Sequence, residues 1–435
     1  MGRLRVCLVA GLAIAWLLGP GVRLAAAQGE QQVLRQQVDQ LRQDFEAIKQ
    51  QYAERLAALE ARLAALQGGP SAPVSPPVGA PASTASGGAD GPGSSALGSS
   101  VASSKVFNPD MAVIGDFLGA AGRNSVTRSP ALEMHESEAS FQAVVDPYAR
   151  ADFFISFGES GVNLEEGFLT FTSLPGGFLT KVGKMRAAFG KVNSLHNHVL
   201  PWADRPLVIN NLVGGEDGIN DAGISVARLI PNPWLFLEAT GQVFRGDSGG
   251  DEHPLFQTSR RSDLSYVGHV RAYQDITEGS NVDLGVSYSR GHNAAGVVNG
   301  ADLGRFTTQL FGVDGTFRWR PLQRSIYRSF VSRAEWIWSQ RDQPTGLQRA
   351  AGGYVSGDYQ LARRWFVGGR YDRSNRADDA AALDTGGSLL LTYWPSEFSQ
   401  VRGQYRRTNY AGDIAADEFL FQFQFSIGAH GAHPF

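Results

Sequence analysis

The sequence has little of what many folds use for stability. Its 435 residues include a single cysteine, Cys7, so no disulfide can form within the chain. Charged residues make up 19%, below the roughly 25% of ordinary soluble domains. The net charge of −3 excludes the overall basic character of a nucleic-acid-binding protein. Glycine, at 52 residues, and aromatic residues, at 10%, are abundant instead, which is typical of all-β chains.

Long apolar runs are also missing after the amino-terminal leader. Between residues 28 and 435 no run of 18 or more apolar residues occurs, which excludes helical membrane spans there. A β-barrel is not excluded, because each of its strands needs only about 10 residues of alternating character. The first 27 residues combine two arginines, an apolar run over residues 6–18 and an Ala-x-Ala end at Ala27. These are the three parts of a secretory signal peptide.

The alternative for residues 1–27 is a retained membrane anchor, which would need about 20 apolar residues. Gly19, Pro20 and Arg23 interrupt the run in this sequence. Cys7 precedes the run, so it is not placed as the acylated cysteine of a lipoprotein. Cleavage after Ala27 would leave a mature chain without cysteine, which prevents wrong disulfides during export through an oxidising periplasm.

Residues 28–67 are predicted to form an α-helical coiled coil. Apolar residues recur at alternating spacings of four and three from Leu34 to Leu66, which is the seam through which such helices associate. A second spacing of four after Tyr52 is a stutter, which unwinds the supercoil locally without ending it. The alternative is a single amphipathic helix that lies on a membrane or on the rest of the protein. Residues 68–104 are nearly all Gly, Pro, Ser and Ala, and predict a disordered linker.

Residues 105–435 alternate between apolar and polar side chains with a period of two, the period of a β-strand. In the last segment Phe419, Phe421 and Phe423 alternate with residues such as Gln422 and Gln424. About 16 such segments occur, and an even number of strands between 8 and 26 is expected of bacterial outer-membrane barrels. The predicted fold is therefore all-β, a transmembrane antiparallel β-barrel of about 16 strands.

A soluble β-sandwich or propeller is the alternative fold for this region. Charged residues on the polar side of many strands argue against a sandwich, because its inner face has to be dry. A water-filled lumen accommodates such residues. Aromatic residues near the segment ends are expected in the girdles at the two membrane interfaces. They are Trp234, Tyr266, Trp338, Tyr354, Trp365, Tyr393 and Trp394, and the terminal Phe435 adds to this pattern.

One stretch of the barrel region resembles a known family. Residues 178–190 contain Gly-Lys and Phe-Gly, and residues 214–223 contain Gly-Gly-Glu-Asp-Gly followed by Asp-Ala-Gly. This order resembles the phosphate-selective porin O and P family of Gram-negative outer membranes, over the barrel only. The resemblance implies a 16-stranded, usually trimeric barrel that acts as a passive diffusion pore. The sequence shows no dense ladder of lumen arginines and lysines, the feature that gives the named members of the family their preference for phosphate. Phosphate is therefore not carried over as the substrate. Between the two motifs lie Asn193, His196, His198, Asp204, Arg205 and Pro206.

Charges of both signs would line the lumen if the polar side of each strand faces inward. This mixture predicts weak charge selectivity, whereas segregation of the signs to opposite walls would produce a transverse field. The pairs Arg333/Glu335 and Arg370/Asp372 lie two residues apart on one face, and we expect each pair to form an ion pair. The candidate pore-lining residues are Arg150, Arg271, Arg318, Arg320, Arg333, Arg370, Arg402 and Arg406 with Glu136, Glu138, Asp152, Glu238, Asp283, Asp314, Glu335 and Asp372.

Residues 191–217 interrupt the rhythm of short connections. Loops of this length inside a compact domain are usually functional or disordered. We expect this segment to fold into the lumen as a constriction, with Asp204, Arg205, Glu216 and Asp217 facing permeant solutes. The alternative is an extracellular loop that covers the rim. Two histidines without a third ligand are weak evidence for metal, so no metal or cofactor is predicted at His196 and His198, nor at His430 and His433.

The sequence therefore predicts an outer-membrane porin for passive diffusion of small hydrophilic solutes or ions. We expect its coiled coil in the periplasm and a homotrimer formed through the barrel and the coil. The expected partners are outer-membrane lipid, solutes and a periplasmic or cell-wall component, and not nucleic acid. Nucleophile-elbow, zinc-protease and phosphate-loop motifs are missing from the sequence, so no enzyme is predicted. The alternative is a structural tether or adhesin that the barrel anchors and the coiled coil oligomerises.

Overall fold

The structure is a computed structural model. The predicted signal peptide (1–27), coiled coil (28–67) and linker (68–104) lie outside the described residues, as do His430, His433 and Phe435. In the part of the chain that is described, no helix is long and apolar enough to cross a membrane. The described residues are 109–127, 129–158, 161–250, 254–298, 301–302 and 304–428.

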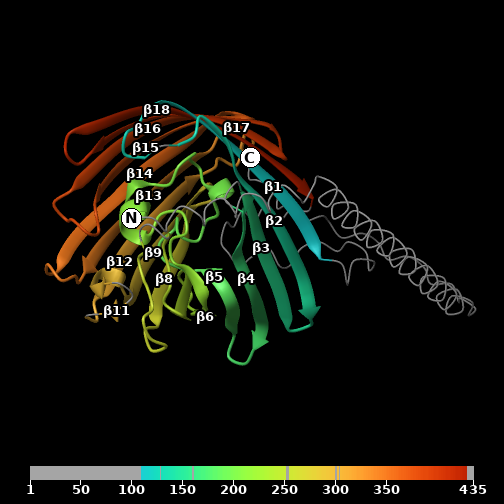
Figure 1. Ribbon diagram of the computed structural model, residues 1–435. Coiled ribbons are helices and arrows are strands. Elements are labelled where there is room, and N and C mark those ends of the chain that lie inside the picture. Colours follow the sequence, from blue (N-terminus) through green and yellow to red (C-terminus); the bar gives the residue numbers. More distant parts are fainter. Residues whose placement is uncertain are drawn as a thin grey trace, which may run out of the picture. The chain divides into compact units, whose positions relative to one another are not determined.

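Sixteen antiparallel strands of the described chain close into one barrel (Figure 1). Each strand pairs with its neighbours in sequence, and the barrel closes where β1 pairs with β18. The predicted all-β barrel of about 16 strands is therefore confirmed. A separate two-stranded ribbon consists of β10 (Val297–Val298) and β11 (Ala301–Asp302). The barrel strands are β1 (Asp110–Arg123), β2 (Leu132–Asp146), β3 (Ala149–Gly158), β4 (Gly161–Leu174), β5 (Phe178–Arg186), β6 (Asn220–Leu229), β7 (Phe236–Phe244), β8 (Ser265–Thr277), β9 (Ser280–His292), β12 (Thr307–Trp319), β13 (Phe330–Arg341), β14 (Gln348–Ala362), β15 (Trp365–Asn375), β16 (Leu383–Ser396), β17 (Ser399–Tyr410) and β18 (Ile414–Gly428).

The two faces of the barrel follow the period of two. In β18, Phe419, Phe421 and Phe423 are exposed on the outside, whereas Gln422 and Gln424 are buried inside. Successive side chains of a strand point to opposite faces, so one strand can present an apolar and a polar side at once. The same division around the barrel gives it an apolar outer surface. Exposed residues there include Ile224, Val226, Val270, Leu284, Val286, Val313, Leu389 and Leu391.

The connections differ in length between the two ends of the barrel. At the end where β1 begins and β18 finishes, the turns 147–148, 278–279, 363–364 and 397–398 are short. The opposite end carries the longest connection, residues 187–219 between β5 and β6. This connection contains the predicted segment 191–217 and extends beyond it on both sides.

Most of the aromatic residues predicted at the interfaces lie on the outside. Trp234, Tyr266, Trp338 and Trp365 are exposed, and Tyr393 and Trp394 are half-buried. The prediction is wrong for Tyr354, which is only 5% exposed and contacts Trp202 inside the barrel at a centroid distance of 5.1 Å. In β14 the residue after it, Val355, is 51% exposed. Tyr354 therefore belongs to the inward-facing set of its strand.

Candidate functional site

The connection between β5 and β6, called here the inward segment (residues 187–219), lies inside the barrel. It contains the 3₁₀ helix η1 (Asn197–Val199) and the π-helix η2 (Ile209–Val213). Its apolar side chains pack against inward-facing side chains of the wall, because burial removes both from water. This internal core includes Phe189, Val192, Leu200, Trp202, Val208, Ile209, Leu212 and Val213 of the segment with Leu310, Ile337, Tyr354 and Leu390 of the strands.

Asn193 holds the two ends of the inward segment together. Its Nδ2 donates to the carbonyl oxygens of Ala187 (2.9 Å) and Ile219 (3.1 Å), and its Oδ1 accepts from the Ile219 amide at 2.8 Å. Gly218 has a φ of 57°, and a Cβ there would lie 2.2 Å from Asn193 Oδ1. Only glycine fits this position without strain.

The segment first meets the wall at β7, where the Ala188 amide donates to Gln242 Oε1 at 2.7 Å, and at β9 and β13. The Lys191 ammonium donates to Asp283 Oδ2 at 2.8 Å, and the Gly190 amide donates to Ser287 Oγ at 2.9 Å. On β13, Glu335 Oε2 accepts from the Val192 amide at 3.4 Å. Gly190 permits this close approach, because a Cβ there would overlap Glu335.

A second contact, called here the acidic anchor (Glu138, Glu165, Glu166 and His196), joins the segment to β2 and β4. The His196 imidazole lies with Nδ1 2.6 Å from Glu138 Oε2 and 3.1 Å from Glu165 Oε2. Its Nε2 lies 2.7 Å from Glu166 Oε2. Burial opposes a charge on this ring, but the three carboxylates outweigh it and hold the pKa of His196 well above its usual value.

A third contact, called here the basic anchor (Asp204, Arg370, Gln404 and Arg406), joins the segment to β15 and β17. Asp204 Oδ2 accepts from Arg370 Nη2 at 2.9 Å and from Arg406 Nη1 at 2.8 Å. Its Oδ1 accepts from Gln404 Nε2 at 2.5 Å. Burial alone would raise the pKa of Asp204, but the two guanidinium groups lower it to about 2. Arg370 also donates to Asp372 Oδ2 at 2.7 Å.

The four predicted constriction residues fall into two groups. Asp204 and Arg205 are engaged within the packed interior, and Arg205 donates to Asn197 Oδ1 and to the Leu195 carbonyl. Arg205 therefore maintains the fold of the segment itself. Glu216 and Asp217, by contrast, are exposed, with a side-chain exposure of 52% for Glu216. These two carboxylates are the members of the predicted set that water and solutes can reach.

Most of the predicted pore-lining charges face inward, and several of them are paired with one another. Arg150 pairs with Asp152 at 2.8 Å, and Arg271 pairs with Asp283 at 2.7 Å. Asp314 and Glu335 lie buried in the same wall as Asp283. The half-buried Arg318 lies with Nη1 3.8 Å from Asp283 Oδ2. Two further arginines have partners outside the predicted set. Arg406 forms an ion pair with Glu418 on β18, and Arg402 donates to Gln422 Oε1 at 2.7 Å.

The two predicted pairs at a spacing of two behave differently. Arg370 and Asp372 form the expected ion pair. Arg333 instead pairs with Asp358 on the neighbouring strand β14 at 2.6 Å, because Glu335 faces the inward segment. The prediction of an Arg333/Glu335 pair is therefore wrong. Arg320 is also not a wall residue, since it is exposed just beyond the end of β12 and its amide donates to the Gly279 carbonyl.

Sequence reasoning missed Glu165 and Glu166, two adjacent residues that both reach the interior. A register shift in the β3–β4 pairing places Phe154 opposite Glu166 and Ile155 opposite Leu164, so Glu165 is an extra, bulged residue. A second shift, between β1 and β2, makes His135 the extra residue next to Glu136. Bulges interrupt the alternation of side chains and are frequent beside functional sites. A period of two cannot anticipate them.

No protein-family model matches this chain. An uncharacterized protein of Aquifex aeolicus (strain VF5) is 29% identical over 391 residues, which is 77% of this chain and 81% of that protein. The chain is also similar to solved structures of outer-membrane proteins. OmpTdeltaL8 of Vibrio cholerae aligns with a TM-score of 0.49 and 12% identity, over 73% of this chain and 99% of that chain.

The anion-selective porin from Comamonas acidovorans aligns with a TM-score of 0.51 and 11% identity, over 73% of this chain and 99% of that chain. At this identity the likeness concerns the fold alone. It does not extend to the phosphate-selective family, so membership in that family stays a prediction. The barrel of this chain has a porin-like fold.

Proposed function

We propose that this protein is an outer-membrane porin in which the inward segment narrows the path for small hydrophilic solutes or ions. One observation carries the proposal: a closed barrel with an apolar outside contains a segment bonded to separate parts of its inner wall. His196 meets β2 and β4, whereas Asp204 meets β15 and β17. Any solute that crosses the barrel has to pass this segment.

The outer surface supports placement in a membrane. Val286 is 60% exposed and Leu389 is 68% exposed, and both belong to an apolar surface that continues around the strands. Soluble monomers rarely expose continuous apolar areas larger than a few hundred Å². An apolar outside and a polar inside are the arrangement expected of an outer-membrane barrel. The predicted signal peptide at residues 1–27 agrees with export to that membrane.

The inner surface supports a narrow path. Inward-facing polar side chains such as Ser289, Thr308 and Gln404 are fully buried, although a wide, water-filled barrel would leave them accessible. The space beside the inward segment is therefore small, which favours ions and small solutes over large ones. No catalytic role is part of the proposal.

The accessible charges favour a weak preference for cations. Arg370 and Arg406 are each neutralised by carboxylates, and Glu216 pairs with His135 at 3.2 Å, whereas Asp217 is exposed. Permeant ions respond most to the charges that remain accessible in a pore. The phosphate-selective family that the sequence resembles would instead predict a preference for anions. Reversal potentials in a salt gradient distinguish the two.

The decisive experiment measures single-channel conductance in planar bilayers. We expect a variant that lacks residues 197–208 to conduct several-fold more than the parent, because the deletion removes both Asp204 and the helix η1 from the interior. Heat-modifiable migration on gels verifies that the barrel still closes. An unchanged conductance of the folded variant would falsify the role of the segment. A folded parent without any conductance would favour the tether or adhesin.

The assembly is a further part of the proposal. We expect a homotrimer that forms through the barrel and through the coiled coil at residues 28–67, which lies outside the described residues. Cross-linking of the full chain and of a chain that begins at residue 105 tests this directly. Trimers of the full chain and weaker association of the shorter one are the expected result. Monomers in both cases would contradict it.

A further inference from the structure

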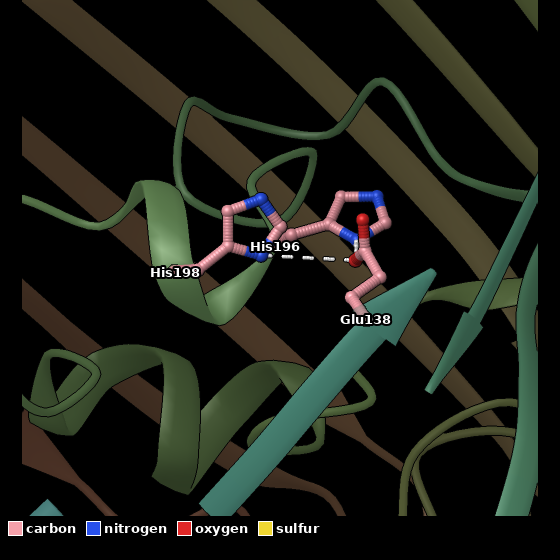
Figure 2. Close-up of side chains that lie close together, drawn as sticks. All are labelled: Glu138, His196 and His198. Atoms are coloured by element: carbon pink, nitrogen blue, oxygen red, sulfur yellow. Dashed lines mark hydrogen bonds and ion pairs between the residues drawn. The ribbon is translucent and has the colours of Figure 1, made fainter. Parts of the chain in front are cut away.

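Three side chains far apart in the sequence converge beside the inward segment. Glu138 extends from β2, and His196 and His198 flank Asn197 in the segment (Figure 2). One ligand atom from each of the three lies within 4.8 Å of the others. Glu138 Oε2 is 2.6 Å from His196 Nδ1 and 3.7 Å from His198 Nδ1. The third ligand that the sequence did not reveal is therefore supplied by a strand 58 residues earlier.

The surroundings of these side chains are rich in carboxylates, of which Glu165 also pairs with Arg186 Nη2 at 3.2 Å. Glu136, Glu138 and Glu165 are all buried, and their carboxylates also lie within 4.8 Å of one another. Within the described residues Glu136 Oε1 is buried without a hydrogen-bond partner. Ionised carboxylates only accept hydrogen bonds, so neighbouring carboxylates are satisfied only when a proton or a cation lies between them. A cation at this place would neutralise them.

The histidine geometry suits a metal ligand rather than a surface side chain. Glu166 Oε2 lies 2.7 Å from His196 Nε2 and fixes a proton there, which leaves Nδ1 directed toward Glu138. Ligating histidines nearly always donate their other ring N–H to a carboxylate or carbonyl in this way. The bulge that carries Glu165 places its Oε2 3.1 Å from the same Nδ1, as a fourth donor.

We propose that Glu138, His196 and His198, with Glu165 as a fourth ligand, bind a divalent transition-metal ion of the Zn²⁺ type. Two imidazole nitrogens and two carboxylate oxygens suit Zn²⁺ better than Ca²⁺ or Mg²⁺, which prefer six or more oxygens. The ion replaces the proton that His196 Nδ1 shares with Glu138. It ties the inward segment to β2 and β4, and this binding does not depend on whether the barrel conducts.

The competing arrangement is a metal-free one, in which a doubly protonated His196 alone bridges the carboxylates. The two differ in the role of His198, which contributes a ligand only in the metal-bound form. The full chain is purified in detergent, treated with a chelator and titrated with Co²⁺ and Zn²⁺. All variants carry H430Q and H433Q, so that the C-terminal histidines do not bind metal.

We expect about one ion per chain, with Co²⁺ absorption bands of a tetrahedral site. Loss of a residue that hydrogen-bonds a metal ligand typically weakens metal binding 10–100-fold, and Glu166→Gln tests such a residue. His198→Gln removes a ligand itself and should weaken metal binding at least as much. His269→Gln is the matched control, because His269 lies inside the barrel on β8 but bonds to Ser287 Oγ at 2.8 Å. It should bind the ion as the parent does.

The proposal is overturned if the folded parent binds no metal, or if His198→Gln binds as tightly as His269→Gln. Heat-modifiable migration on gels shows which variants are folded. Should His198→Gln not fold, Glu166→Gln decides the matter, because parent-like affinity and Co²⁺ bands in that variant would also contradict the site.

Discussion

The acidic anchor and the basic anchor hold the same segment by opposite arrangements of charge. On β2 and β4 a single cationic imidazole, His196, is surrounded by carboxylates. On β15 and β17 a single carboxylate, Asp204, is surrounded by Arg370 and Arg406. The two walls thus carry opposite charges, and the segment presents the complementary charge to each. Charge complementarity fixes where each part of the segment docks.

The two anchors differ in how completely their charges are compensated. At the basic anchor each arginine has a second carboxylate, Asp372 for Arg370 and Glu418 for Arg406. Beside the acidic anchor, Glu136 Oε1 is left without a hydrogen-bond partner among the described residues. The basic anchor is therefore complete with protein groups alone, whereas the acidic anchor needs a proton or a metal ion. The effect of a substitution at the basic anchor should therefore be the same with and without added metal ion.

The largest effect is expected from Arg370→Ala. This guanidinium bonds to Asp204 and Asp372 and lies 4.9 Å from the Trp202 ring. Removing one partner of a buried ion pair costs about 3–5 kcal/mol, because the other charges remain buried. Hydrogen exchange of residues 197–208 measures the free energy of local opening. Arg407→Ala is the matched control, since its ion pair with Asp417 is exposed and should contribute less than about 1 kcal/mol.

Equal exchange rates in the Arg370→Ala and Arg407→Ala proteins would show that the basic anchor does not hold the segment. Faster exchange near Asp204 with unchanged exchange at His196 would mean that the two anchors open independently.

A smaller effect, and one with a defined pH dependence, is expected from Asp204→Asn. The pKa of Asp204 in the folded protein, about 2, lies below its ordinary value of 3.8, so the ionised form stabilises the folded state. This stabilisation, about 2 kcal/mol, is fully present above the ordinary pKa and is lost as the pH falls through about 2. Urea midpoints of the parent and the variant should therefore differ at pH 6 and converge near pH 2. A difference that stays constant with pH would contradict the electrostatic origin.

Asn193→Ala tests the neutral contact that belongs to neither anchor. It removes three hydrogen bonds at the base of the segment and should cost about 1–3 kcal/mol of unfolding free energy. Gly218→Ala should cost a similar amount, because its Cβ would meet Asn193 Oδ1. We expect the double variant to lose less unfolding free energy than the two single variants together, because without the Asn193 side chain the Cβ at position 218 meets no oxygen. Strict additivity in urea unfolding would argue against direct coupling of the two positions.

The smallest effect is expected from Asp217→Asn. This carboxylate is exposed and belongs to neither anchor, so stability should change by less than about 0.5 kcal/mol. The cation preference in reversal-potential measurements should fall toward zero. A preference that remains unchanged would place the selective charges elsewhere on the wall.

The alternation of apolar and polar residues predicts which face of a strand lies outside, but it does not predict which charged side chains pair. The alternation in β18 predicts which phenylalanines lie outside, because the pleat itself sets the period. The same reasoning fails at Tyr354, where an aromatic side chain occupies an inward position. It also fails at Arg333, whose partner lies across the strand pair on Asp358. Pairing between charges depends on register and on what fills the interior.

Local periodicity and segment length are enough to predict a barrel of about 16 strands, its apolar outside and the location of one long connection. What that connection meets depends on how the sheet closes. The bulge at Glu165 adds a carboxylate that no period announces, and the closed barrel brings Glu138 to His196 and Arg370 to Asp204. These contacts join residues far apart in the chain, so the closure of the sheet, and not any local preference, brings them together.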